Sequence, residues 1–240
     1  MTKAEGQTSI GSDWSITTNR YVGFIDIMGF KDMVARSTHE EIYVMMQEIE
    51  STKKANENIK WSGNEEPKVM STFYSDSIIL YSKDDSEDSA RVIINTISAL
   101  TNDLISSGIP HKGALAFGNM TLDNKKSIYF GQPLIDAYLL QEELVMYGIV
   151  LHSSAEAEID KLGILETVIL YDFLCPFKGG SSHHLTIPPI FAGKTSDADD
   201  EAEQEALMKG LRGFRRKTSG YIRKYIDNTD MFLKKCNTDL

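Results

Sequence analysis

The chain has 240 residues, of which 41% are hydrophobic, and 25 basic against 35 acidic side chains give a formal net charge of −10. This size and composition predict one domain with decorations, and the acidic balance argues against a general nucleic-acid surface. With two cysteines and no apolar run of membrane-spanning length, the sequence predicts a cytoplasmic protein with neither a nucleic-acid nor a membrane partner.

The first predicted element is a strand that contains a carboxylate. Residues 1–19 are polar and predict a flexible N-terminal arm, and the run YVGFIDIMGF over residues 21–30 then has the β-branched and aromatic content of a buried strand. Asp26 lies inside this run. A buried carboxylate normally becomes protonated or finds a cation, so a metal ion or an ion pair with a lysine or arginine is expected beside it.

Helices and strands then alternate as far as residue 147. A helix is predicted at about residues 30–55, and a β-hairpin at 68–82 has Ser75 and Asp76 in its turn. A second helix at 84–108, a strand at 109–120, and a strand end with a helix within 127–148 follow. The order βαββαβ plus a further helix predicts an α+β, ferredoxin-like core with an antiparallel sheet and helices on one face.

Residues 148–240 are predicted to form an α/β extension of the same domain. IVLHSS and ETVILYDFL are typical of strands, FKGGSSHHL of a loop, and residues 196–217 and 218–236 of helices. In the predicted loop, His183 and His184 have no partners at ligand spacing and indicate surface histidines rather than a zinc site. The lysines and arginines of the last helix are interpreted as solvated surface.

Two carboxylates are predicted to meet at one end of the sheet. Asp26 ends the first strand and Asp76 lies in the hairpin turn, so they converge if the hairpin lies beside that strand. Neighbouring carboxylates repel, and divalent cations remove that cost. Oxygen ligands without His or Cys suit Mg²⁺ or Mn²⁺, and free N–H groups from Met28 to Lys31 could bind a polyphosphate. Together these features predict a nucleoside triphosphate site.

Two motifs carry a family resemblance over about residues 20–147. FIDIMGF resembles the F-x-D-I-x-G-F signature of class III nucleotidyl cyclases, and YSDSIILYS resembles their second metal-aspartate hairpin, K-x-x-G-D. The resemblance implies a catalytic core in which one cation activates the ribose 3′ hydroxyl and a second neutralises the departing pyrophosphate. The implied ligands of the two cations are Asp26, Asp76 and the carbonyl of Ile27. The implied phosphate-binding backbone is that of Met28, Gly29 and Phe30.

The chain departs from this family at the base and transition-state positions. Thr72 stands where purine cyclases carry a base-reading lysine, and Ile128 stands where they carry a base-reading aspartate. Ile135 and Leu139 occupy the positions of the transition-state asparagine and arginine. Lys112 is the nearest candidate cation for transition-state charge, with a solvated strand-end lysine as the alternative.

A narrower resemblance concerns the substrate. The run GQPLIDAYLLQE, preceded by HKGALAFG, resembles the pyrimidine cyclases of Pycsar antiphage defence, which make cyclic UMP or cyclic CMP as a signal for a downstream effector. Tyr74 is a candidate to stack on a small base and exclude a purine, with ordinary hairpin packing as the alternative. A purine cyclase and a non-catalytic cyclase-like module remain alternative functions. The family also implies a two-fold homodimer with composite active sites.

Overall fold

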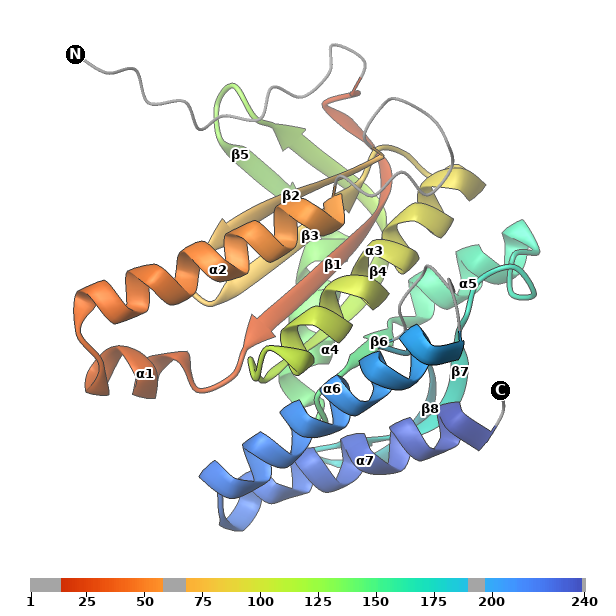
Figure 1. Cartoon of the computed structure of the whole chain (residues 1–240). Coiled ribbons are helices and arrows are strands. Elements are labelled where there is room, and N and C mark those ends of the chain that lie inside the picture. Colours follow the sequence, from red (N-terminus) through yellow and green to blue (C-terminus); the bar gives the residue numbers. More distant parts are fainter. Residues whose placement is uncertain (1–13, 58–67, 190–196, 239–240) are drawn as a thin grey trace, which may run out of the picture.

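An eight-stranded sheet forms the centre of the fold, in the order β2-β3-β1-β4-β6-β8-β7 with β5 paired to β4 (Figure 1). The structure is a computed structural model that describes residues 14–57, 68–189 and 197–238. Among the described strands, β4 and β6 run parallel and the other neighbours are antiparallel. The strands are β1 (Thr17–Ile27), β2 (Val69–Tyr74), β3 (Ser77–Ser82), β4 (His111–Asp123), β5 (Ile128–Gly131), β6 (Ile149–Leu151), β7 (Tyr171–Phe177) and β8 (Gly180–Ile187).

Helices cover both faces of this sheet. On one face, Ile49 of α2 and Ile97 of α3 share an apolar core with Ile25 of β1. On the other, Ala137 of α4 and Phe232 of α7 share a second core with Phe24, while α6 lies against α3 and α7. No helix of the described residues is long and apolar enough to cross a membrane. The helices are α1 (Phe30–Arg36), α2 (His39–Glu57), α3 (Glu87–Ser106), α4 (Gln132–Glu143), α5 (Ser153–Leu162), α6 (Asp197–Lys217) and α7 (Arg223–Thr238), with a 3-10 turn at Gly220–Ile222.

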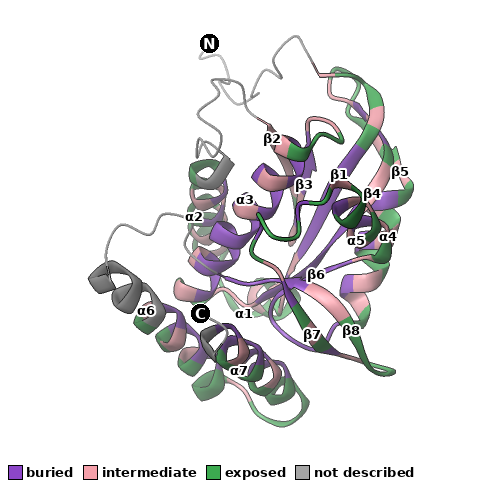
Figure 2. Ribbon diagram, turned by 90° about the vertical axis from the view of Figure 1, so that its right-hand side faces the viewer, coloured by how far each residue is buried: buried purple, intermediate pink, exposed green. Residues whose placement is uncertain are grey.

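The position of β1 explains its nearly continuous apolar sequence. β1 lies between β3 and β4, and its successive residues Phe24 and Ile25 enter opposite cores. A strand that is buried on both faces needs apolar side chains at neighbouring positions rather than an alternation with polar ones. Figure 2 shows the resulting buried centre of the sheet. A carboxylate at Asp26 is therefore placed at the end of a strand that is enclosed on both faces.

The arrangement confirms the predicted α+β, ferredoxin-like core. β1, α2, β2, β3, α3 and β4 follow the βαββαβ order, and the four strands pair as β2-β3-β1-β4. Both helices of this core lie on one face, as expected. The later helices α4 and α7 cover the opposite face, so the sheet as a whole is enclosed from both sides.

The helix predicted for about residues 30–55 is two helices. Ser37 has an extended backbone, with φ −109 and ψ 159, and ends α1. Thr38 and Glu41 then form a capping box at the start of α2. The N–H of Glu41 donates to Thr38 Oγ1 at 3.3 Å, and the N–H of Thr38 donates to Glu41 Oε2 at 2.8 Å. This capping box begins a new helix, although the apolar residues alone predict one continuous helix across this position.

Several further boundaries differ from the prediction, among them those of β1 and β8. β1 begins at Thr17, so residues 17–19 belong to the sheet, and residues 1–13 of the predicted arm lie outside the described residues. The predicted loop FKGGSSHHL instead follows β7 through a two-residue turn into β8, which places His183 and His184 in a strand. Pairing with β7 along the whole of β8 outweighs the low strand propensity of its glycine and serines.

We predict that Gly210→Ala destabilises the protein by about 1–3 kcal/mol because it separates α6 from α3. A Cβ at Gly210 would lie 1.9 Å from the carbonyl oxygen of Ile105, which belongs to the backbone of α3 and cannot rotate away. Urea denaturation followed by circular dichroism measures the change.

Gly213→Ala in the same helix is the matched control. A Cβ there has no neighbour within 4 Å, so this variant should gain roughly 0.5–1 kcal/mol from the better helix propensity of alanine. Equal effects of the two substitutions would contradict the close helix contact.

Candidate active site

Four side chains form a row across the end of the sheet. The strand registers place Tyr74 of β2 opposite Ser77 of β3, Ser77 opposite Asp26 of β1, and Asp26 opposite Lys112 of β4. Directly opposed residues point to the same face of a sheet. Phe24 lies two residues before Asp26 and belongs to the α4 core, so the row lies on the α4 face. Tyr74 and Asp26 are two strand spacings apart, roughly 10 Å.

Asp26 and Asp76 come together at this end of the sheet. The hairpin turn consists of Ser75 and Asp76, and the N–H of Ile27 donates to the carbonyl of Asp76 at 2.8 Å. The pKa of Asp26 rises to about 6, first because the carboxylate is partly buried and second because Asp76 is negative. The hairpin therefore lies beside the first strand, as the predicted convergence required.

Lys112 is buried beside Asp26 rather than solvated. Its side chain is 3% exposed, and Nζ donates to the carbonyl of Glu142 at 3.1 Å. Burial lowers the pKa of Lys112, and the charges of Glu142 and Asp26 oppose that shift. The positive charge lowers the pKa of Asp26 in turn, although no ion pair of Asp26 occurs within the described residues. The interpretation of Lys112 as a solvated lysine is wrong. The alternative in which Asp26 forms a structural ion pair is supported by no direct contact in the described residues.

The turn after β1 leaves two of the three predicted phosphate-binding N–H groups available. Gly29 adopts the left-handed conformation with φ 79, which favours glycine. Within residues 14–57, 68–189 and 197–238, no acceptor is found for the N–H groups of Gly29 and Phe30. The N–H of Met28, however, donates to the carbonyl of Pro110 at 2.8 Å. Met28 therefore supports the turn, because its N–H is already bonded to Pro110, the residue directly before β4.

The donor set fits a divalent metal that arrives with a nucleotide. The N–H of Ile27 points toward the hairpin turn, and the N–H and C=O of one strand residue point to the same side, so its carbonyl lies beside Asp76. Two carboxylates and a carbonyl are hard oxygen ligands, which suit Mg²⁺ or Mn²⁺ bound together with phosphates. The part of the chain that the structure describes contains no group of three or more His, Cys, Asp or Glu side chains arranged to hold a metal ion. Phosphate oxygens would have to complete the coordination.

The candidate base-pocket residues lie on the same face as Asp26. Thr72 is in the adjacent cross-strand row with Ile79 and Phe24, and its side chain is hydrogen-bonded to the phenol of Tyr81. Tyr74 is 78% exposed, so hairpin packing does not account for it. Ile128, Ile135 and Leu139 are also exposed, on β5 and α4.

Glu142 is a residue of this site that the sequence did not indicate. It lies near the end of α4, its carbonyl accepts from Lys112, and its negative charge raises the pKa of Asp26. Glu142 is 116 positions from Asp26, and the two meet because α4 crosses the face of β1 and β4. Helical periodicity cannot reveal which strand a helix crosses.

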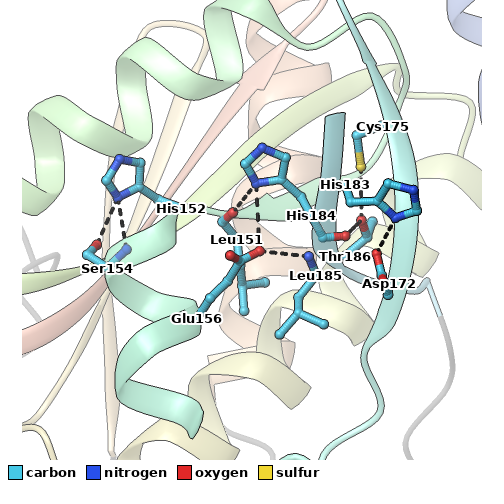
Figure 3. A network of polar contacts seen from close by, with 10 residues as sticks. All are labelled: Leu151, His152, Ser154, Glu156, Asp172, Cys175, His183, His184, Leu185 and Thr186. Carbon is cyan, nitrogen blue, oxygen red and sulfur yellow. Dashed lines mark hydrogen bonds and ion pairs between the residues drawn. The ribbon is translucent and has the colours of Figure 1, made fainter. Parts of the chain in front are cut away.

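The two histidines in β8 belong to a separate polar network (Figure 3). His183 Nδ1 lies 2.7 Å from Asp172 across the β7–β8 pair, and His184 Nδ1 lies 2.9 Å from the carbonyl of Leu151. Glu156 accepts from the N–H of Leu185 at 2.8 Å. The side chains tie α5 and β7 to β8, which is a structural role.

Solved structures of cyclase domains share this arrangement of strands and helices. The guanylate cyclase domain of RhGC from Catenaria anguillulae in complex with GTP matches 71% of this chain and 96% of its own, with a TM-score of 0.54 and 16% identity. The catalytic core of a rhodopsin-guanylyl cyclase with converted specificity, in complex with ATPαS, matches 74% and 99%, with a TM-score of 0.56 and 14% identity. The chain has the cyclase-domain fold. No protein-family model matches its sequence, and no curated protein does.

The segment that follows α4 in this cyclase fold is fixed by α7. The side chain of Asn228 donates to the carbonyl of Val145 at 2.7 Å, and Thr229 Oγ1 accepts from the N–H of Tyr147 at 2.8 Å. Backbone groups of the buried residues Val145 and Tyr147 are satisfied in this way. α7 thus supports the segment that begins directly after α4, the helix whose Glu142 carbonyl accepts from the buried lysine.

We predict that Asp26→Asn stabilises the metal-free protein at pH 7–8 and has little effect at pH 4. The folded protein retains a proton on Asp26 up to about pH 6, whereas the unfolded chain releases it near pH 4. Stability is therefore lost as pH rises through this window, by about 2–3 kcal/mol, and asparagine avoids the loss. Urea denaturation in a chelator across this pH range measures the difference.

Asp160→Asn removes an exposed carboxylate from α5 and serves as the control. If the difference in the free energy of unfolding between the wild type and Asp26→Asn stays constant from pH 4 to pH 8, the raised pKa of Asp26 is contradicted.

Proposed function

We propose that the chain is a nucleotidyl cyclase that converts a pyrimidine nucleoside triphosphate, UTP in preference to CTP, into the 3′,5′-cyclic nucleotide and pyrophosphate. The observation that carries the proposal is the Asp26–Asp76 pair, fixed by the hydrogen bond from Ile27 at the end of β1. A cyclase-domain fold around this pair supports the assignment. A close pair of carboxylates lowers stability in the metal-free protein, so a role in binding cations accounts for its presence.

The residues of the chain would act by binding and orienting the triphosphate. Asp26, Asp76 and the Ile27 carbonyl would hold two Mg²⁺ or Mn²⁺ ions, which when bound supply an activated 3′ hydroxyl and charge neutralisation at the pyrophosphate. The N–H groups of Gly29 and Phe30 would donate hydrogen bonds to the phosphate oxygens. The charge of Lys112 favours the ionised form of Asp26, but the burial of Lys112 and its bond to Glu142 direct it away from the role of transition-state cation.

Base selection is the finer part of the proposal. Thr72 has no charge and bonds to Tyr81, and Ile128 has no polar group, so neither supplies the charged contacts that read a purine edge. Tyr74 stands exposed in the same row as Asp26 and is placed to stack on a smaller base. A purine cyclase is the second candidate, since the similar solved domains carry GTP and ATPαS.

A homodimer with composite sites is part of the same proposal. The outer surface over β5 and α4 exposes several large apolar side chains, an arrangement typical of protein interfaces. These side chains are Ile128, Phe130, Ile135, Tyr138 and Leu139. A two-fold partner covering them would bring its own residues to the α4 face, where the row of Asp26 lies. The cyclic product would then act on a downstream effector in antiphage defence.

We predict that UTP gives the main cyclic product when all four triphosphates compete at equal concentration with Mn²⁺. A polar site rejects substrates that leave its buried groups unpaired, so the preference over ATP and GTP should be large. Chromatography of the products measures it. Cyclic AMP or cyclic GMP as the main product would overturn the pyrimidine assignment, and the absence of any cyclic product would favour a non-catalytic module.

Asp26→Ala and Asp76→Ala should each lower turnover by at least about a thousandfold while the fold is retained, because each removes a metal ligand. Asp172→Ala, which removes an exposed carboxylate on β7, is the control and should retain activity. Initial rates with Mn²⁺ and circular dichroism are the measurements. Wild-type rates in either of the first two variants would refute the two-metal site.

Tyr74→Ala should reduce the preference for UTP over ATP by about tenfold, since it removes an aromatic stacking contact of roughly 1 kcal/mol and opens the pocket. Tyr43→Ala changes a tyrosine of similar exposure, 61%, on α2 and should leave the preference unchanged. The measurement is the ratio of kcat/KM values. An unchanged ratio in Tyr74→Ala would remove Tyr74 from the base pocket.

A further inference from the structure

The turn between α6 and α7 gathers positive charge in an acidic protein. Residues 212–227 contain six basic side chains and one acidic side chain, a net of +5, whereas the whole chain carries −10. The basic side chains are all exposed, and we call them the basic tip: Arg212, Arg215, Arg216, Lys217, Arg223 and Lys224. Figures 1 and 2 both place this turn at the lower end of the molecule, and its ribbon is largely exposed.

Stabilisation of the helices explains only part of this charge. Cations at the end of α6 complement its dipole, but Arg223 and Lys224 stand in the first turn of α7, where cations are unfavourable. Of the six, Arg215 forms an ion pair with Asp227. In the described residues no acidic partner occurs for the other five. Arg223 donates to the carbonyl of Thr218 at 3.0 Å and Lys224 lies over the ring of Tyr221. The exposed charges that remain are those of Arg212, Arg216 and Lys217.

The helices that carry the basic tip share an apolar cluster with the candidate phosphate-binding turn. Met28 packs against the apolar cluster that contains Phe214 of α6 and Tyr225 of α7. Arg215 and Lys224 are the immediate sequence neighbours of these two aromatics, and successive Cα atoms are about 3.8 Å apart. The negative charge of Glu142 raises the pKa of Tyr225 and also that of Asp26. The two helices that carry the basic tip are thus linked to the turn at Met28 through this shared apolar cluster.

We propose that the basic tip attracts the polyphosphate of the substrate to the adjacent turn at Gly29 and Phe30. The proposal rests on the proposed cyclase function, and it assigns a role to the C-terminal extension. Ile135 and Leu139 supply no charge to the site and Lys112 is buried, so Lys31, exposed directly after Phe30, would meet a tetraanionic triphosphate without help from these three residues. A local positive field overcomes the repulsion from the acidic remainder of the chain.

A small polyphosphate fits this surface better than an extended polyanion. A nucleic acid would run beyond the tip along the acidic body, where repulsion opposes it. A triphosphate needs positive potential only near one end of the sheet. The Debye length of about 10 Å at 0.1 M salt is long enough for the tip to act on an anion at the neighbouring turn.

The test neutralises three cations for which no bond within the tip is found: Arg212→Gln, Arg216→Gln and Lys217→Gln in one variant. Calorimetric titration with tripolyphosphate and Mn²⁺ should give a Kd about fivefold higher than wild type at roughly 20 mM salt, and the difference should shrink toward 200 mM. With UTP, KM should rise and kcat should stay unchanged, because the tip acts before the chemical step.

A second triple variant, Lys54→Gln, Arg91→Gln and Lys161→Gln, changes the net charge equally at cations that pair within their own helices. It should bind tripolyphosphate as the wild type does. An unchanged Kd in the tip variant, or an equal change in the control, would overturn the proposal. Loss of binding to phosphatidylserine vesicles or single-stranded DNA with unchanged tripolyphosphate binding would overturn it too. Absence of a cyclic product from the wild type would instead reject the proposed function, and tripolyphosphate affinity would still decide the role of the tip.

Discussion

The repulsion between two partly buried carboxylates is the constraint on which the site depends. Asp26 stands at the end of a strand enclosed on both faces, and Asp76 is fixed beside it by the hydrogen bond from Ile27. The fold does not relieve this repulsion with a direct ion pair in the described residues. It places Lys112 across the neighbouring strand, where the lysine favours the charged form of Asp26 without occupying its oxygens. A cation from solution can therefore still reach both acids.

Several elements far apart in the chain share the support of this acidic pair. The carbonyl of Glu142 holds Lys112, and the segment after α4 is hydrogen-bonded by Asn228 and Thr229 of α7. Met28 is held by Pro110 on one side and by the α6–α7 cluster on the other. The extension is thus in contact with both the lysine support and the phosphate turn. It is a structural part of the site rather than an appendage.

The sequence predicted what short-range patterns determine. The order βαββαβ follows from apolar periods and turn residues, and the meeting of Asp26 with Asp76 follows from strand pairing. The sequence did not predict the division of the helix at Ser37, because a capping box outweighs the apolar period there. It did not predict the strand around His184, because pairing with β7 outweighs local propensity. The sequence did not predict the positions of Glu142 and the basic tip for another reason. Their places in the fold depend on the packing of helices, which no local pattern encodes.

The hydroxyl of Thr229 links the order of synthesis to the completion of the site. It accepts from the N–H of Tyr147 at 2.8 Å and donates to the carbonyl of Tyr225 at 2.7 Å. The N–H of Tyr147 therefore obtains its hydrogen-bond partner only when α7, which carries Thr229, has been synthesised. Residues 223–238 leave the ribosome after all the strands have emerged. Until then the carbonyl of Val145 and the N–H of Tyr147, in the segment that follows α4, lack these hydrogen-bond partners. The candidate site therefore gains its full set of supporting hydrogen bonds only after α7 has docked.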